Sequence, residues 1–168
     1  MSQTEPSNPI DPRVTVGHVH LKVAEIERSL DFYCGVLGFQ VVERWGKDAA
    51  FIAAGDYHHH IGLNTWESKG GKPPAPGTTG LYHVALLYPT RAALGDALLR
   101  LQRAGIALSG AADHGVSEAL YLNDPDGNGL ELYWDKPRDV WPRNERGEIA
   151  MYSRALDIEG LIRVAAGG

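Results

Sequence analysis

Residues 117–134, SEALYLNDPDGNGLELYW, read as two strands joined by a tight turn. Asp124–Gly129 supplies the turn, because Pro presets φ and Asp, Asn and Gly tolerate left-handed positions. Alternation along residues 130–134 predicts Glu131 and Tyr133 on one face and Leu130, Leu132 and Trp134 on the other. A carboxylate inside such a strand is costly to bury unless it is paired or binds a metal. Glu131 therefore indicates either a metal ligand or a solvated face of the sheet.

The same turn also matches the opening of an EF-hand calcium loop, Asp124-x-Asp126-x-Asn128-Gly129. Position 12 of that loop would be Asp135, where the motif requires a bidentate Glu. The flanking residues favour strands over helices. The pattern is therefore weak evidence for calcium.

Length and composition indicate a globular protein of one domain or two small modules. The net charge of −5 gives no indication of nucleic acid or an anionic membrane as a partner. A single cysteine, Cys34, excludes an intrachain disulfide and fits a reducing compartment. There is no apolar run of the ~18 residues that a membrane span needs. The polar, proline-rich start is unlike a signal peptide, so we expect a cytoplasmic location.

The rest of the chain divides into two similar modules. We expect a leader at 1–13, a first module at 14–66, a linker at 67–79, a second module at 80–134, and a tail at 135–168 that acts as a lid or an interface. The first module is predicted to have strands at 14–23, 39–44, 49–53 and 58–65 and a helix at 25–37. The second is predicted to have strands at 81–88, 106–109, 118–123 and 130–134 and a helix at 92–104, with Thr90 as its N-cap.

The two opening strands carry matching histidines: His18-Val19-His20-Leu21 before the first helix and His83-Val84-Ala85-Leu86 before the second. This repeat predicts an α+β fold. Two tandem βαβββ modules would form a paired, cupped mixed sheet around a metal-centred cavity. Such pairing would bring His18, His83 and Glu131 within reach of one another.

Four pieces of the sequence resemble the vicinal oxygen chelate superfamily, which includes glyoxalase I, bleomycin- and fosfomycin-resistance proteins and extradiol dioxygenases. They are GHVHLKVAEIERSLDFYCGVLGF at 17–39, HHHIGLNTW at 58–66, GLYHVALLYP at 80–89 and SEALYLNDPDGNGLELYW at 117–134. The chain looks most like the catechol 2,3-dioxygenase-like members. The resemblance implies that His18, His83 and Glu131 are metal ligands.

The fourth ligand position of glyoxalase I-like enzymes, usually Glu, corresponds to Gly62, which cannot ligate through a side chain. Two His and one carboxylate remain, which is the facial triad of non-haem Fe(II) oxygenases. The resemblance thus implies an Fe(II)-dependent extradiol ring-cleaving dioxygenase. Its partners would be O₂ and a catechol-type diol that chelates the iron. Mn(II) or another divalent metal is the alternative cofactor, and a homodimer is left open.

Two further residues match functional positions by the same resemblance. Tyr121, ten residues before Glu131, would hydrogen-bond a substrate oxygen, and His114 would serve as an acid–base group. A core tyrosine and a solvated loop histidine are the competing interpretations. His20 shares a predicted face with His18 and is the rival ligand. We expect one of His58, His59 and His60 to line the cavity.

Two other functions remain as alternatives. One is a divalent-metal Lewis-acid enzyme of glyoxalase or fosfomycin-resistance type, which metal preference would distinguish. The other is a metal-free drug-binding resistance protein. The presence of all three predicted metal ligands argues against a metal-free binding protein.

Overall fold

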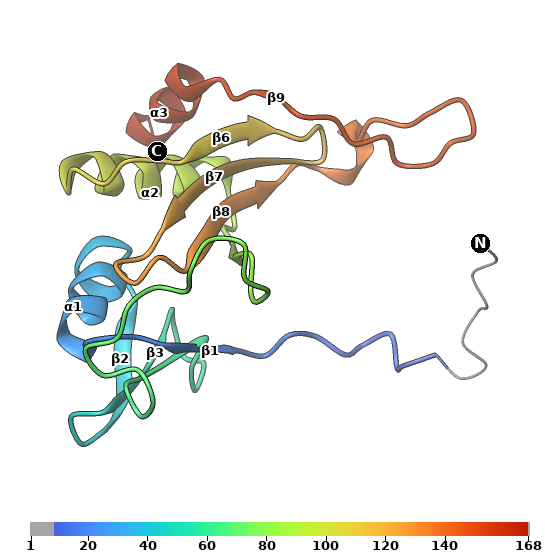
Figure 1. Cartoon of the computed structure of the whole chain (residues 1–168). Coiled ribbons are helices and arrows are strands. Elements are labelled where there is room, and N and C mark those ends of the chain that lie inside the picture. Colours follow the sequence, from blue (N-terminus) through green and yellow to red (C-terminus); the bar gives the residue numbers. More distant parts are fainter. Residues whose placement is uncertain (1–8, 168) are drawn as a thin grey trace.

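Two β-α-β-β-β modules follow one another in the computed structural model, which describes residues 9–167 (Figure 1). Part of the predicted leader, residues 1–8, lies outside the described residues. The first module contains β1 (Val19–Lys22), α1 (Ile26–Leu30), the π-helical η1 (Asp31–Val36), β2 (Gln40–Trp45), β3 (Ala49–Ala53) and β4 (Ile61–Asn64). The second contains β5 (Val84–Leu87), α2 (Arg91–Arg103), β6 (Gly110–Asp113), β7 (Ser117–Asn123) and β8 (Gly129–Asp135).

The two modules form separate sheets with the same internal order. The first sheet runs β1-β4-β3-β2, and the second runs β5-β8-β7-β6-β9, where β9 is Arg154–Ala155. In each module the opening strand pairs in parallel with the last strand, β1 with β4 and β5 with β8. The predicted α+β fold of repeated modules is confirmed. No helix of residues 9–167 combines the length and apolar character that crossing a membrane requires.

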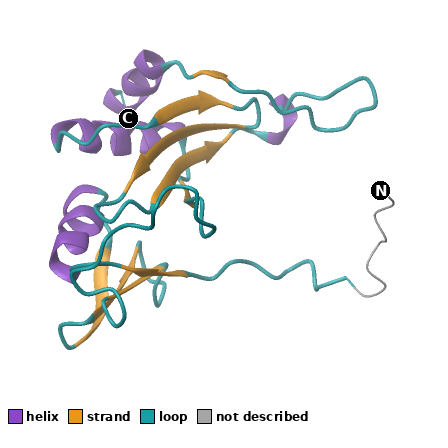
Figure 2. Ribbon diagram, in the orientation of Figure 1, coloured by secondary structure: helices purple, strands orange, loops and turns teal. Residues whose placement is uncertain are grey.

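Helices cover one side of each sheet (Figures 1 and 2). The helix α2 is capped by Thr90, whose side chain accepts a hydrogen bond from the Ala93 amide, so the predicted N-cap is confirmed. The tail adds η2 (Arg138–Val140), β9 and α3 (Ile158–Ala166). The helix α3 packs on α2 at Gly95, where an added Cβ would lie 2.5 Å from the Leu161 carbonyl oxygen. Only glycine allows the two helix backbones to approach this closely.

Several predicted strand limits are wrong. The opening strands begin at Val19 and Val84 rather than at residues 14 and 81, so His18 and His83 directly precede their strands. Residues 106–109 precede the strand, because the helix end uses Ile106 in a Schellman cap: Gly105 has φ +69° and the Ile106 amide donates to the Leu101 carbonyl. The strand β6 therefore begins at Gly110. Likewise β4 begins at Ile61, where pairing with Val19 starts, so His58–His60 lie in a loop.

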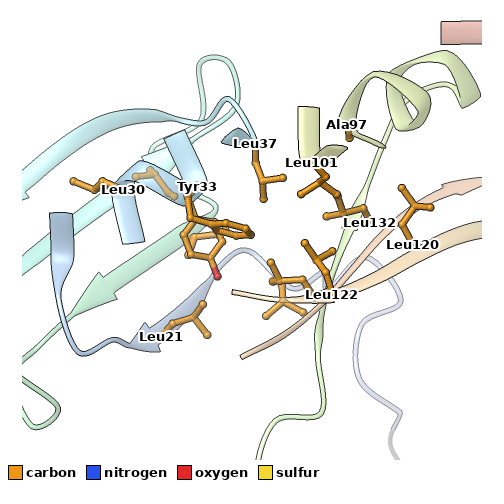
Figure 3. Close-up of a cluster of buried hydrophobic side chains, with 14 of the residues drawn as sticks. Leu21, Leu30, Tyr33, Leu37, Ala97, Leu101, Leu120, Leu122 and Leu132 are labelled. Atoms are coloured by element: carbon orange, nitrogen blue, oxygen red, sulfur yellow. The ribbon is translucent and has the colours of Figure 1, made fainter. Parts of the chain in front are cut away.

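The hydrophobic core is shared by the two modules. Figure 3 shows Leu21 and Tyr33 of the first module in one cluster with Leu101 and Leu122 of the second. Tyr33 and Leu101 are completely buried. Apolar side chains thus pack continuously across the module boundary, and the modules stabilise one another at this end.

Buried polar groups also join the two modules. Arg28 and Tyr33 of the first module bind Asp124 and Asp126 of the second, and we call these four residues the latch. Tyr33 Oη donates to Asp124 Oδ2 at 2.9 Å, and Asp126 Oδ1 accepts from the Ala24 amide at 3.0 Å and from Arg28. Both aspartates are less than 10% exposed. Burial and the Asp124 charge raise the pKa of Tyr33, so it remains a neutral donor. Asp124 and Asp126, the two aspartates of the motif that resembles a calcium loop, therefore join the two modules.

Replacing Tyr33 by Phe is expected to lower the free energy of unfolding by about 1–2 kcal/mol, because a buried carboxylate loses a hydrogen bond. Asp124 Oδ2 would keep only the amide of Asn128 as a side-chain donor. Urea unfolding measures the change, with Tyr57→Phe as the control because Tyr57 is 40% exposed. Equal stability of the two variants would contradict a stabilising latch.

Candidate metal centre

His83 and Glu131 lie side by side in the second module. His83 directly precedes β5, and Glu131 lies on β8 opposite Ala85 of that strand. His83 Nε2 is 3.0 Å from Glu131 Oε2, and their side chains are 30% and 15% exposed. Two cis ligands of a first-row metal, each bonded at roughly 2.1 Å, have donor atoms roughly 3.0 Å apart. The spacing of these two atoms fits two ligands of one ion.

Tyr121 approaches the other oxygen of the same carboxylate. It faces Glu131 directly in the antiparallel β7–β8 register, and its hydroxyl donates to Glu131 Oε1 at 2.9 Å. Burial, and then the hydrogen bond and charge of Glu131, raise the pKa of Tyr121 to about 12. The phenol is therefore protonated at neutral pH and can donate a hydrogen bond.

His114 extends this network away from the carboxylate. It follows β6, and its Nε2 lies 2.7 Å from Tyr121 Oη. Its Nδ1 lies 3.1 Å from the backbone carbonyl oxygen of Tyr152 in the tail. One continuous series of polar contacts, which we call the relay, thus runs from the backbone carbonyl of Tyr152 through His114, Tyr121 and Glu131 to His83.

A cavity of about 610 Å³ opens beside the relay. Its volume lies in the range of small-molecule sites. Polar groups and aromatic rings share its wall with a few aliphatic side chains. The lining residues are Tyr82, His83, Ser109, Gly110, Tyr121, Leu122, Asn123, Gly129 and Leu130. A ligand held here would contact both His83 and Tyr121.

His18 does not join this group. It lies exposed in the first module, with its ring 4.4 Å from that of His59 and 6.4 Å from that of His58. Within residues 9–167, no three or more His, Cys, Asp or Glu side chains are close enough together to hold a metal. One copy of the chain thus brings together two of the three predicted ligands, and the full facial triad does not fit the residues that a single copy gathers.

His20, the rival ligand, lies flat over Gly62. A Cβ at Gly62 would meet the His20 ring at 2.9 Å, and the ring also contacts Phe51 and Trp66. Burial and the nearby His18 lower the pKa of His20. Glycine at position 62 therefore has a packing role, because it leaves room for the His20 ring.

Tyr152 is the relay member that the sequence analysis missed. It contributes through a backbone carbonyl, which any residue type possesses, so side-chain patterns carry no trace of it. Tyr82 and Ser109 were also missed as cavity residues. Tyr82 lies next to His83, and this adjacency was the one available indication.

The comparisons with known proteins agree with this architecture. Residues 15–132 match the model of the Glyoxalase/Bleomycin resistance protein/Dioxygenase superfamily. The chain is 46% identical over 151 residues to the catechol-2,3-dioxygenase of Bacillus subtilis (strain 168), covering 89% of this chain and 52% of that protein. It is 36% identical over 118 residues to biphenyl-2,3-diol 1,2-dioxygenase 2 of Rhodococcus globerulus, covering 70% of this chain and 61% of that protein. The chain thus spans between half and two thirds of the length of these two relatives.

Solved structures show the same fold at low sequence identity. A glyoxalase/dioxygenase from Nostoc punctiforme matches with a TM-score of 0.63 and 21% identity, covering 79% of this chain and 100% of that one. The lactoylglutathione lyase from Agrobacterium tumefaciens matches with a TM-score of 0.57 and 19% identity, covering 74% and 96%. Because the family model spans nearly all of both modules, the chain belongs to the glyoxalase/bleomycin resistance protein/dioxygenase superfamily.

Proposed function

We propose that this protein is an Fe(II)-dependent extradiol dioxygenase that cleaves a catechol-type ring. In such a reaction both atoms of O₂ enter the product, and one ring C–C bond beside the hydroxyl carbons breaks. The observation that carries the proposal is the relay, which joins a His–carboxylate pair with ligand spacing to a phenol and an imidazole beside a cavity. The names of the two dioxygenase relatives support it.

Each residue of the relay has a separate task in this proposal. His83 and Glu131 would hold the iron, which supplies the O₂ chemistry when bound. Tyr121, neutral at physiological pH, would hydrogen-bond an oxygen of the diol in the cavity. His114 would accept the proton that leaves the diol, because imidazole is the side chain suited to proton transfer near neutral pH.

The third ligand, His18, would come from a second copy of the chain. The face of the first sheet around His18 leaves Trp45 60% and Trp66 58% exposed. On the second module, Tyr82 is 90% and Leu87 57% exposed. A contiguous apolar patch formed by such side chains would mark an interaction surface. A two-fold dimer in which each first sheet faces the partner's second sheet would cover both faces and complete two identical sites.

The first test uses metal-free protein reloaded with Fe(II) under anaerobic conditions. Catechol and substituted catechols are then added with O₂, and the visible spectrum is followed for a yellow ring-opened product. Product formation supports the proposal. Iron demonstrably bound without any product would overturn it for these substrates and favour Lewis-acid chemistry.

Tyr121→Phe is expected to lower the turnover number by about 100-fold or more, because the variant loses the hydroxyl that links the cavity to the proton acceptor His114, and positioned proton transfer contributes on that scale. Turnover is expressed per bound iron, because Tyr121 donates a hydrogen bond to Glu131 Oε1 and its loss also weakens iron retention. Tyr133→Phe is the matched control, because Tyr133 lies two residues beyond Glu131 on the same face of β8. Equal turnover of both variants and the wild type would remove Tyr121 from the mechanism.

The Lewis-acid alternative is weakened by Gly62, which leaves the first module without the extra carboxylate of glyoxalase I-like enzymes. A metal-free binding role would require the His83–Glu131 pair to serve no metal. Retention of Mn(II), Ni(II) or Zn(II) in preference to Fe(II) would favour the Lewis-acid enzyme, and retention of no divalent metal would favour the metal-free binding protein.

We also propose a cytoplasmic location, which fits the lone, half-buried Cys34.

A further inference from the structure

His114 is held from both sides, and one of its two neighbours belongs to the tail. Nε2 contacts Tyr121 Oη at 2.7 Å, while Nδ1 contacts the carbonyl oxygen of Tyr152 at 3.1 Å. A carbonyl oxygen can only accept hydrogen bonds, whereas a phenol hydroxyl can donate or accept. The Tyr152 carbonyl therefore requires a hydrogen on Nδ1, whereas the Tyr121 hydroxyl can turn its single hydrogen from Glu131 Oε1 to His114 Nε2.

The contact with Tyr152 is built into the fold. The Tyr152 amide donates to the His114 carbonyl at 3.2 Å, so the two residues bind each other through two contacts. The adjoining strand β9 pairs with β6 immediately before His114, with Arg154 opposite Asp113. The guanidinium of Arg154 lies 4.2 Å from the centre of the Tyr152 ring.

Packing against Gly115 restricts the tail further. A Cβ at Gly115 would lie 2.7 Å from both Pro142 and the Tyr152 ring, and Gly115 has φ +80°. The tail is thus seated against the loop that carries His114. This seating holds the Tyr152 carbonyl in front of Nδ1.

We propose that the tail is a positioning element that sets the tautomer of His114: when the ring is neutral, its hydrogen sits on Nδ1. The opposite tautomer would place the Nδ1 lone pair against the carbonyl oxygen of Tyr152 and lose that hydrogen bond. In the Nδ1–H form, Nε2 presents a lone pair to Tyr121. His114 is thereby a proton acceptor toward the cavity rather than a donor.

The arrangement has a consequence for Tyr121. Its single hydroxyl hydrogen faces two acceptors, His114 Nε2 at 2.7 Å and Glu131 Oε1 at 2.9 Å. A proton taken up from a bound diol would complete both hydrogen bonds and come to rest on His114. This consequence rests on the proposed ring-cleaving function, whereas the tautomer itself does not.

The test is a long-range ¹⁵N–¹H correlation spectrum of the imidazoles in the full, metal-free chain, recorded at a pH where histidine is neutral. His114→Gln identifies the signals of His114 by their disappearance. The expected spectrum shows a protonated Nδ1 and an unprotonated Nε2. A protonated Nε2 with an unprotonated Nδ1 would overturn the proposal without any measurement of activity.

A tail variant tests the cause. Tyr152→Pro removes the amide that holds the tail to His114, and the fraction of His114 protonated at Nε2 is expected to rise. Met151→Ala is the matched control, because Met151 is 63% exposed and directly precedes Tyr152. An unchanged tautomer in folded Tyr152→Pro would show that the tail does not set it; if that variant does not fold, the wild-type spectrum still decides the assignment.

Activity provides a second, separate readout. In the Fe(II)-loaded protein, Tyr152→Pro is expected to lower kcat for ring cleavage at least several-fold while KM for the diol changes little, because the cavity wall is intact. If KM for the diol instead rose by the same factor by which kcat fell, Tyr152 would have a merely structural role. Absence of ring cleavage in the wild type would refute the proposed function but leave the spectroscopic result standing.

Discussion

Glu131→Ala is expected to abolish ring cleavage and to weaken Fe(II) retention by more than about 100-fold, since even residues that only support a ligand cost 10–100-fold when removed. The loss of this side chain also leaves His83 Nε2 and Tyr121 Oη without their shared carboxylate partner. Iron content after gel filtration and the yield of yellow product measure the two effects.

Asp135→Ala is the control for this variant, because Asp135 is an exposed carboxylate at the end of the same strand. It should retain iron and activity. His83→Ala should reproduce the loss of iron seen in Glu131→Ala. If Glu131→Ala binds iron as tightly as the control, the carboxylate is no ligand and Glu131 only orients Tyr121.

A mixture of two inactive variants is expected to regain activity. His18→Ala and Glu131→Ala should each be inactive alone, because each removes one ligand from every site. Unfolded together and refolded at equal concentration, they would form mixed dimers with one intact site. Random pairing in a two-fold dimer predicts about one quarter of the wild-type activity.

The outcome distinguishes two ways of completing the site. If closure of one chain brought its own His18 to its own His83, every refolded molecule would lack a ligand and the mixture would stay inactive. A mixture of His83→Ala with Glu131→Ala is the matched control, because both residues lie in the same module. That mixture should remain inactive in either case.

Local patterns predicted part of the geometry within the second module. Alternation along residues 130–134 placed Glu131 and Tyr133 on one face, the family resemblance indicated Tyr121, and the antiparallel register puts Tyr121 opposite Glu131. His83 followed from the repeat of the opening strand. These are rules of strand geometry, which act over a few residues and are visible in one sequence.

The position of His18 was not predictable in the same way. Its place relative to His83 depends on how two sheets are oriented, which is set by the shared core and by the latch. The aspartates of the latch were interpreted as turn residues and a weak calcium motif, because their partners Arg28 and Tyr33 lie almost 100 residues earlier. Contacts over such separations leave no periodic pattern in a single sequence.

Sequence patterns also predicted wrong strand limits where a residue with strand-forming character adopts a different local structure. Ile106 has strand-forming character, but the end of the preceding helix uses its amide in the cap. The three histidines at 58–60 resemble a continuation of the next strand, but pairing starts only at Ile61. A local helix-cap hydrogen bond decided the first case, and the pairing of β4 with β1 decided the second.

The close approach of α3 to Gly95 matters for anyone who divides this chain into parts. The second module has two stacked helical layers, and the outer one, α3, buries Leu161 completely. A gene fragment that stops after β8 would remove this layer and uncover the inner helix. Because the two modules also share a core, the unit to express is the whole chain, and any exchanged or duplicated fragment must keep the tail together with the second module.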